Sequence, residues 1–215
     1  MERLKQQVAD AALEHLGDVT ILGVGTGSTI TYFIQALARI KHRIDGCVAS
    51  SAATEAQLKA AGLPVITLAV AEPLALYVDG ADEVTRHRSM IKGGGGAMTR
   101  EKIIANAASS FLCLVDESKL VRRLGAFPVA VEVIPMARSL VARALVKLGG
   151  DPIYREGCVT DNGNHVLDVH HLNLDEPMAM EEAIQLIPGV VDHGIFAKRP
   201  ADSVLMARAG GVALF

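Results

Sequence analysis

The segment GVGTGST, Gly23 to Thr29, places small and hydroxyl-bearing residues where a short apolar stretch gives way to a helical pattern. Backbone N–H groups at a helix N-terminus, together with the helix dipole, form an anion site. Glycines let that backbone approach a phosphate, and the hydroxyls of Thr26, Ser28 and Thr29 add donors. The glycine spacing fits neither the GxGxxG dinucleotide fingerprint nor a Walker A loop. The segment therefore indicates a phosphate-binding turn, with a plain strand-to-helix turn as the alternative.

The acidic turn DGAD, Asp79 to Asp82, is a second candidate ligand-binding segment. It follows the apolar stretch 74–78. Ligands of open α/β sheets bind beyond the carboxyl ends of the strands. Two carboxylates three residues apart at such an end can bind sugar hydroxyls, move protons or hold a metal ion. The competing interpretation is an Asp-rich turn that caps the next element.

The segment KGGGGAMTREK, Lys92 to Lys102, is the third candidate ligand-binding segment. Four consecutive glycines cost conformational entropy, so they suit a loop whose backbone lies against a ligand. Lys92 enters this loop, and Glu101 follows near the start of a predicted helix. A carboxylate and an ammonium that converge on one cleft suit proton abstraction beside a carbonyl, because the base takes the proton while the cation stabilises the enolate. A flexible loop followed by a solvated charged face is the alternative.

Lys119, in the segment DESK at 116–119, also follows an apolar stretch. It can reach a phosphate or a substrate oxygen if it is not an ordinary surface lysine. The seven histidines show no metal-ligand spacing, and the three cysteines include no CxxC pair. We therefore expect neither a metal site nor a disulfide framework.

The composition indicates a globular protein. The chain has 215 residues, of which 50% are hydrophobic and 21% charged, and its net charge of −3 gives no nucleic-acid footprint. No apolar run approaches the roughly 20 residues of a membrane-spanning helix. The N-terminal segment lacks the apolar core of a secretory signal, so we expect a cytoplasmic protein without membrane or nucleic-acid partners.

Short apolar strands alternate with helical stretches up to residue 128, which predicts a mostly parallel sheet covered on both faces. One of these strands is expected at 65–68. After residue 128 the order becomes βαββαβ, the ferredoxin-like pattern. We therefore expect an α/β fold with two domains. These are a Rossmann-like catalytic domain over 1–128 plus 204–215 and a smaller ferredoxin-like α+β domain over 129–203.

Taken together, these segments resemble ribose-5-phosphate isomerase of the A type, and the resemblance spans nearly the whole chain. It implies the same two-domain fold and the interconversion of ribose 5-phosphate and ribulose 5-phosphate in the non-oxidative pentose phosphate pathway. It also implies that no cofactor is needed and that the protein is a homodimer or homotetramer. The matching segments are GVGTGST (23–29), SxxTE (51–55), YVDGADE (77–83), MIKGGGGAMTREKII (90–104), DESK (116–119), FPVAVEVIPMAR (127–138), TDNGN (160–164) and IPGVVDHGIFA (187–197).

The resemblance also implies the site residues. Glu101 matches the proton acceptor of the family, and the reaction is expected to pass through a cis-enediolate after Asp79 or Asp82 has assisted ring opening. Lys92 is expected to stabilise the charge on oxygen, together with N–H groups of the glycine loop. Contacts of Lys5 stay open. The catalytic residues are Glu101, Asp79, Asp82 and Lys92; the substrate-binding residues are Thr26, Gly27, Ser28, Thr29, Asp79, Gly80, Ala81, Asp82, Lys92, Gly93, Gly94, Gly95 and Lys119.

Other functions fit the same scaffold. A non-catalytic sugar-phosphate sensor would bind the ligand but would need no base and no acid pair. Another sugar-phosphate enzyme, such as an amino-sugar isomerase-deaminase, is a second alternative. An NAD-dependent oxidoreductase is disfavoured by the glycine spacing of the segment 23–29.

Overall fold

The computed structural model describes residues 2–215, which divide into two compact units. Unit 1 contains the described residues up to Ala81, then Arg100–Leu120 and Ala201–Phe215; unit 2 contains Asp82–Thr99 and Val121–Pro200. None of the helices in residues 2–215 combines the length and the apolar character needed to cross a membrane.

Unit 1 is built on a six-stranded sheet in the order β13-β12-β6-β3-β1-β2. All neighbouring strands are parallel except the pair β12 and β13. This confirms the mostly parallel sheet, to which the C-terminal strands β12 and β13 also belong. The strands are β1 (Ile21–Val24), β2 (Gly46–Ala49), β3 (Leu74–Asp79), β6 (Ala108–Asp116), β12 (Ser203–Arg208) and β13 (Gly211–Leu214).

The strand expected at 65–68 is wrong. Val65 makes a single bridge to Cys47, and the chain then turns into a short helix that begins at Leu68. The helices of unit 1 are α1 (Glu2–Ala12), α2 (Ser28–Ala38), α3 (Ala52–Ala60), α4 (Leu68–Ala71) and α5 (Met98–Ala107), whose first residues belong to unit 2, and short 3-10 turns lie at Leu13–His15, Lys41–Arg43 and Glu117–Lys119.

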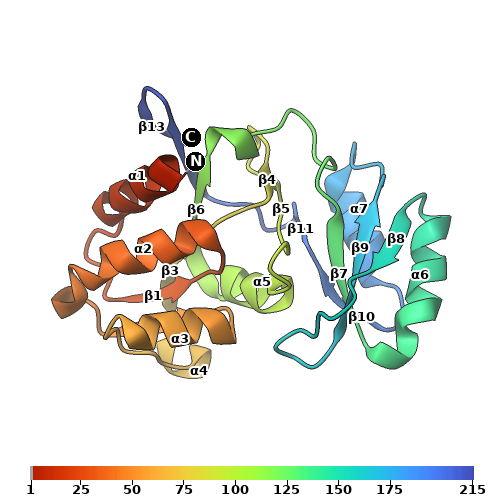
Figure 1. Ribbon diagram of the computed structural model, residues 1–215, viewed down its shortest axis with the longest axis horizontal. Helices are drawn as coiled ribbons and strands as arrows, with labels where there is room; N and C mark the ends of the chain where they lie inside the picture. Colours follow the sequence, from red (N-terminus) through yellow and green to blue (C-terminus); the bar gives the residue numbers. More distant parts are fainter. Residues whose placement is uncertain (1) are drawn as a thin grey trace. The chain divides into compact units, whose positions relative to one another are not determined.

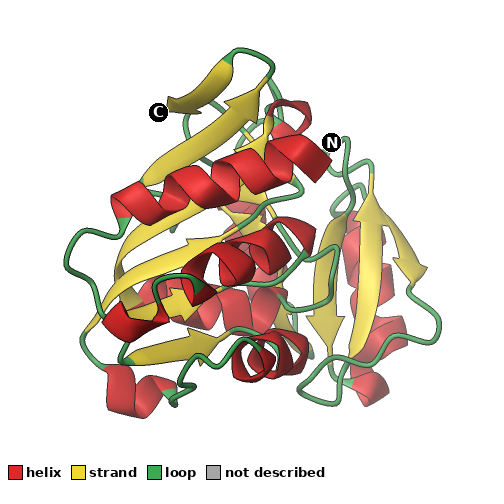
Figure 2. Ribbon diagram, turned by 60° about the vertical axis from the view of Figure 1, so that its left-hand side comes forward, coloured by secondary structure: helices red, strands yellow, loops and turns green. Residues whose placement is uncertain are grey.

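The two faces of the sheet in unit 1 are covered by different helices (Figure 2). Side chains of a strand alternate between the faces, so Leu22 and Val24 of β1 point to one core, which they share with Phe33 of α2. Gly23 points to the other face, where a Cβ atom would lie 2.6 Å from Ile104 of α5. The first glycine of GVGTGST therefore makes room for a helix.

Unit 2 contains a four-stranded antiparallel sheet in the order β10-β7-β9-β8, with α6 and α7 packed along it (Figure 1). Its chain order is β7-α6-β8-β9-α7-β10, so this is the predicted ferredoxin-like arrangement. The elements are β7 (Val129–Val133), a 3-10 turn (Pro135–Ala137), α6 (Arg138–Lys147), β8 (Asp151–Tyr154), β9 (His165–His170), α7 (Pro177–Gln185) and β10 (Val190–His193).

A small antiparallel sheet completes unit 2. It joins β4 (Glu83–Val84) and β5 (Met90–Ile91) to β11 (Ile195–Phe196). This pairing explains why the structure groups the segment 82–99 with unit 2, whereas the sequence-based division places it with residues 1–128.

Candidate active site

The turn from β1 into α2 presents an exposed helix N-terminus. Gly27 occupies the N-cap with a φ of 114°, a conformation that favours glycine, and it has no side chain to accept the first amide hydrogens of α2. Gly27 and Ser28 are exposed. No side chain of the N-cap residue therefore blocks the backbone N–H groups at this end of α2, and a helix N-terminus of this kind suits an anion.

Lys5 brings a positive charge to this turn. Its Nζ donates a hydrogen bond of 2.7 Å to Oγ of Ser28. The sequence left the contacts of Lys5 open, because a lysine in an amphipathic helix is usually solvated. The packing of α1 against α2 determines its place, and no local pattern encodes that packing.

Thr26 differs from its neighbours in the turn, because both of its hydrogen-bond donors are engaged within unit 1. Its N–H donates to Oδ1 of Asp79 at 3.0 Å. Its hydroxyl contacts those of Ser51 and Thr54, the second at 2.6 Å. Thr54 in turn donates to the carbonyl of Gly25 at 2.7 Å. Thr26 therefore fixes the shape of the turn, and the motif SxxTE supplies its partners.

Asp79 ends β3 and is fully buried. Its carboxylate accepts hydrogen bonds from the N–H groups of Thr26 (3.0 Å) and Gly80 (2.7 Å), and from the hydroxyl of Tyr77. A Cβ atom on Gly25 would lie 1.8 Å from Oδ1 of Asp79. The structure thus brings the first glycine motif and the start of the acidic turn into contact within unit 1.

Tyr77 is a site residue that the sequence analysis missed, since a tyrosine in an apolar strand resembles core. Burial raises the pKa of Tyr77 well above its ordinary value, and the negative charges of Asp79 and Glu101 raise it further. The phenol therefore stays protonated and donates to Asp79.

Ala81, Glu101 and Lys119 are the other predicted residues of unit 1. Glu101 lies in the first turn of α5 and is only 3% exposed. Lys119 is half-buried in the 3-10 turn after β6. The strands β1, β3 and β6 are parallel, so their carboxyl ends lie at the same edge of the sheet. Asp79 ends β3 at this edge, and the turn at 26–29 and Lys119 follow β1 and β6 there.

The remaining predicted residues lie in unit 2, where Asp82 contacts the glycine loop. Oδ2 of Asp82 accepts a hydrogen bond of 2.8 Å from the N–H of Gly94. A Cβ atom on Gly94 would lie 2.8 Å from Oδ1 of Asp82. Gly93 has a φ of 108°, and the N–H of Gly96 donates to its carbonyl at 3.0 Å. The glycines thus permit a tight turn around the carboxylate.

Lys92 enters this loop directly after β5 and is 3% exposed. Its Nζ lies 5.7 Å from the centre of the Phe196 ring, within the range of a cation–π interaction. Its N–H donates to the carbonyl of Gly194 at 2.9 Å. Two short strands, β5 and β11, therefore fix the base of the loop.

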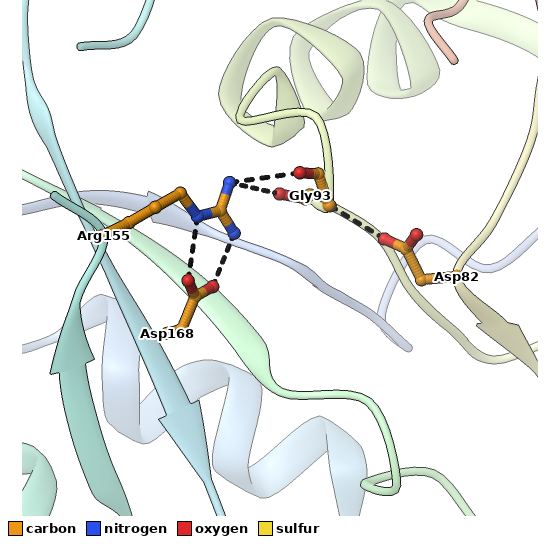
Figure 3. Close-up of polar contacts among 5 residues, drawn as sticks. Asp82, Gly93, Arg155 and Asp168 are labelled. Atoms are coloured by element: carbon orange, nitrogen blue, oxygen red, sulfur yellow. Dashed lines mark hydrogen bonds and ion pairs between the residues drawn. The ribbon is translucent and has the colours of Figure 1, made fainter. Parts of the chain in front are cut away.

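Arg155 contacts the glycine loop, and Asp168 contacts Arg155 (Figure 3). No motif in the sequence predicted a role for either residue. Nη1 of Arg155 donates to the carbonyls of Gly93 (3.1 Å) and Gly94 (3.2 Å). Its other donors face both carboxylate oxygens of Asp168. The described residues contain no group of three or more His, Cys, Asp or Glu side chains that could hold a metal ion.

Known proteins show which family has this combination of fold and residues. The family model of ribose 5-phosphate isomerase A (phosphoriboisomerase A) matches residues 46–211. Ribose-5-phosphate isomerase A of Legionella pneumophila (strain Corby) is 63% identical over 212 residues, which cover 99% of this chain and 98% of that protein.

Solved structures agree with the sequence matches. The crystal structure of ribose 5 phosphate isomerase A from Neisseria gonorrhoeae has a TM-score of 0.97 at 44% identity, covering 100% of this chain and 96% of that one. A D-ribose-5-phosphate isomerase in complex with phospho-erythronic acid has a TM-score of 0.95 at 36% identity, covering 100% and 98%. The resemblance seen in the motifs is confirmed, and the chain belongs to the ribose-5-phosphate isomerase A family.

Proposed function

We propose that the chain catalyses the interconversion of D-ribose 5-phosphate and D-ribulose 5-phosphate. The observation that carries the proposal is the nearly buried carboxylate of Glu101 in the first turn of α5, in a chain of this family. A carboxylate held out of bulk water beside a bound sugar can act as a base, which is the group that an aldose–ketose isomerisation needs.

The exposed N-terminus of α2 is the proposed binding place for the phosphate. Gly27, Ser28 and Thr29 would offer their backbone amides and hydroxyls, and Lys5 adds a positive charge through its contact with Ser28. Thr26 would act by holding the turn in shape. Such binding energy, remote from the reacting carbons, positions the sugar for the chemical step.

Asp82 is the residue that we propose to assist ring opening. It is half-buried and accepts one hydrogen bond from Gly94, whereas Asp79 is fully buried and accepts hydrogen bonds from three donors. A proton acceptor that must meet the substrate needs accessible lone pairs. Asp79 would instead hold the phosphate-binding turn through Thr26.

Glu101 would then remove the proton from C2 of the open-chain aldose, which gives a cis-enediolate. Return of this proton to C1, with transfer of the C2 hydroxyl proton to the oxygen of C1, gives the ketose. The ammonium of Lys92 would stabilise the negative charge that develops on oxygen. The N–H of Gly94 already donates a hydrogen bond to Asp82. We therefore assign the stabilisation of this charge mainly to Lys92 and less to the N–H groups of the glycine loop.

The first test is conversion of ribose 5-phosphate by the purified chain in excess EDTA, in parallel with the variant Glu101→Gln. We expect turnover by the wild type and a loss of about 10²- to 10⁴-fold in kcat for the variant, since it lacks the base. Affinity for phospho-erythronic acid, measured by calorimetry, should stay close to that of the wild type. The exposed Glu117→Gln is the matched control.

Near-normal kcat in Glu101→Gln would show that the base is another residue. Binding of ribose 5-phosphate without turnover by the wild type would favour the sensor. The family resemblance also leads us to propose a cytoplasmic homodimer or homotetramer, which sedimentation of the purified chain would test for its assembly.

A further inference from the structure

In the glycine loop of unit 2, Gly93 to Gly96, one peptide group makes hydrogen bonds to side chains on two opposite sides (Figure 3). The carbonyl of Gly93 and the N–H of Gly94 belong to the same planar trans peptide, so they point in opposite directions. Arg155 donates to that carbonyl at 3.1 Å, and the N–H donates to Asp82 at 2.8 Å. The orientation of this peptide therefore links the guanidinium to the carboxylate.

Within the run of glycines, this peptide is held by one hydrogen bond, from the N–H of Gly96 to the carbonyl of Gly93 at 3.0 Å. Glycine populates positive and negative φ about equally, so a run of four has many accessible conformations. Arg155 narrows this freedom by donating to a second carbonyl, that of Gly94, at 3.2 Å. One guanidinium nitrogen thus fixes two successive peptide groups of the loop.

Asp168 in turn fixes Arg155. Nε of Arg155 lies 2.8 Å from Oδ2 of Asp168, and Nη2 contacts Oδ1, a two-point contact that a planar guanidinium makes with a carboxylate. The two side chains are only 20% and 19% exposed, so solvent screens them less than a surface pair. The hydrogen bond and charge of Asp168 raise the pKa of Arg155, which remains a cation.

We propose that Arg155, held by Asp168, is a positioning residue for the isomerisation. It acts through the peptide of Gly93 and Gly94 on the carboxylate of Asp82 and on the course of the loop that follows Lys92. The inference rests on the proposed roles of Asp82 and Lys92. A merely structural role would be to fasten β8 to β9, since Asp168 pairs with Ile153 across those strands.

The test compares Arg155→Ala and Arg155→Lys with the wild type in steady-state kinetics, at a temperature where all are folded. We expect kcat to fall roughly 10- to 100-fold in Arg155→Ala, as for a misplacement of about 1 Å, while KM changes little. Arg155→Lys should recover only part of the loss, because an ammonium keeps the charge but lacks the planar fork.

Arg123→Ala is the control, because it removes an exposed arginine–aspartate pair, Arg123 with Asp175 at 2.9 Å, in the same unit. A double-mutant cycle tests whether Asp168 acts through Arg155. Asp168→Asn alone should lower kcat, and in the Arg155→Ala background it should lower kcat no further. If the losses in kcat of the two single variants added up in the double variant, Asp168 would not act through Arg155.

Hydrogen exchange provides a readout that does not depend on activity. The amide of Gly94 should exchange faster in Arg155→Ala than in Arg123→Ala, and unchanged exchange would overturn the inference. A wild type without turnover would refute the proposed function, and the exchange result would still decide whether Arg155 orders the loop. A kcat within twofold of wild type in Arg155→Ala, with only a lower Tm, would make the pair structural.

Discussion

At the scale of single residues, the missing side chain of Gly25 is what allows the Asp79 carboxylate to occupy its place. Gly25→Ala would put a methyl group 1.8 Å from Oδ1 of Asp79. Either the carboxylate leaves its donors or the backbone shifts, so we expect a loss of about 1–3 kcal/mol in stability by overpacking, and weaker substrate binding. Urea unfolding and KM measure the two effects.

Gly210→Ala is the matched control, since no atom lies within 4 Å of its added Cβ and its φ is not positive. We expect the urea concentration at the midpoint of unfolding to be the same for this variant as for the wild type. An equally stable Gly25→Ala with normal KM would mean that the Asp79 turn tolerates a shift and that its shape does not set the affinity.

The glycines also show where inference from sequence stops at this scale. The motif 23–29 suggested backbone approach to a phosphate, and Gly27 fits that interpretation. Gly23 instead accommodates Ile104, and Gly25 accommodates Asp79. These partners lie more than fifty residues away in the sequence, so the local pattern could not show that two of its glycines make room for other side chains.

At the scale of elements, the buried Glu132 connects strand β7 to two other segments of unit 2. It is fully buried and accepts hydrogen bonds from Thr160 (2.7 Å), Asn164 (2.8 Å) and Asn162 (3.1 Å) of the turn before β9. It also accepts one from Thr99, in the first turn of α5. The motif TDNGN is therefore a set of donors for one carboxylate.

Replacing this carboxylate tests its structural role. Glu132→Leu should destabilise the protein by more than Glu132→Gln, because it leaves the surrounding donors without an acceptor at about 1–3 kcal/mol for each unsatisfied group. Urea unfolding gives the two free energies, with the exposed Glu156→Gln as control. A Glu132→Leu variant as stable as wild type would show that the turn finds other partners.

The sequence predicted the elements better than their partners. The order βαββαβ was enough to predict the sheet of unit 2, because hydrophobic periodicity and turn residues are local. The strands β4 and β5 have two residues each; they pair with each other, and β5 also pairs with β11, about a hundred residues later. No periodicity can be read over two residues, so the grouping of 82–99 was not predictable.

At the scale of the whole molecule, burial of the Cys47 thiol makes the folded protein less stable at alkaline pH. Burial raises the pKa of Cys47 to about 12 from an ordinary value of 9.0. Between these values the unfolded chain releases the proton and the folded chain keeps it, so stability is fully present below pH 9 and is lost as pH rises toward 12. The expected slope is about 1.4 kcal/mol per pH unit for this thiol.

Cys47→Ala should therefore show a shallower loss of unfolding free energy between pH 9 and 11 than the wild type. Urea unfolding at several pH values gives the slopes. Val159→Ala, which truncates an exposed side chain without a titratable group, should keep the wild-type slope. Equal slopes in Cys47→Ala and wild type would mean that Cys47 titrates alike in both states.

The division of the chain also has a consequence for synthesis on the ribosome. Strand β6 pairs on one side with β3, which precedes it, and on the other with β12, which is translated only after the last residue of unit 2. A growing chain thus carries an open apolar strand edge while the whole of residues 121–200 is made. Such an edge is a template for pairing with other chains, so nascent molecules should depend on chaperones until β12 emerges.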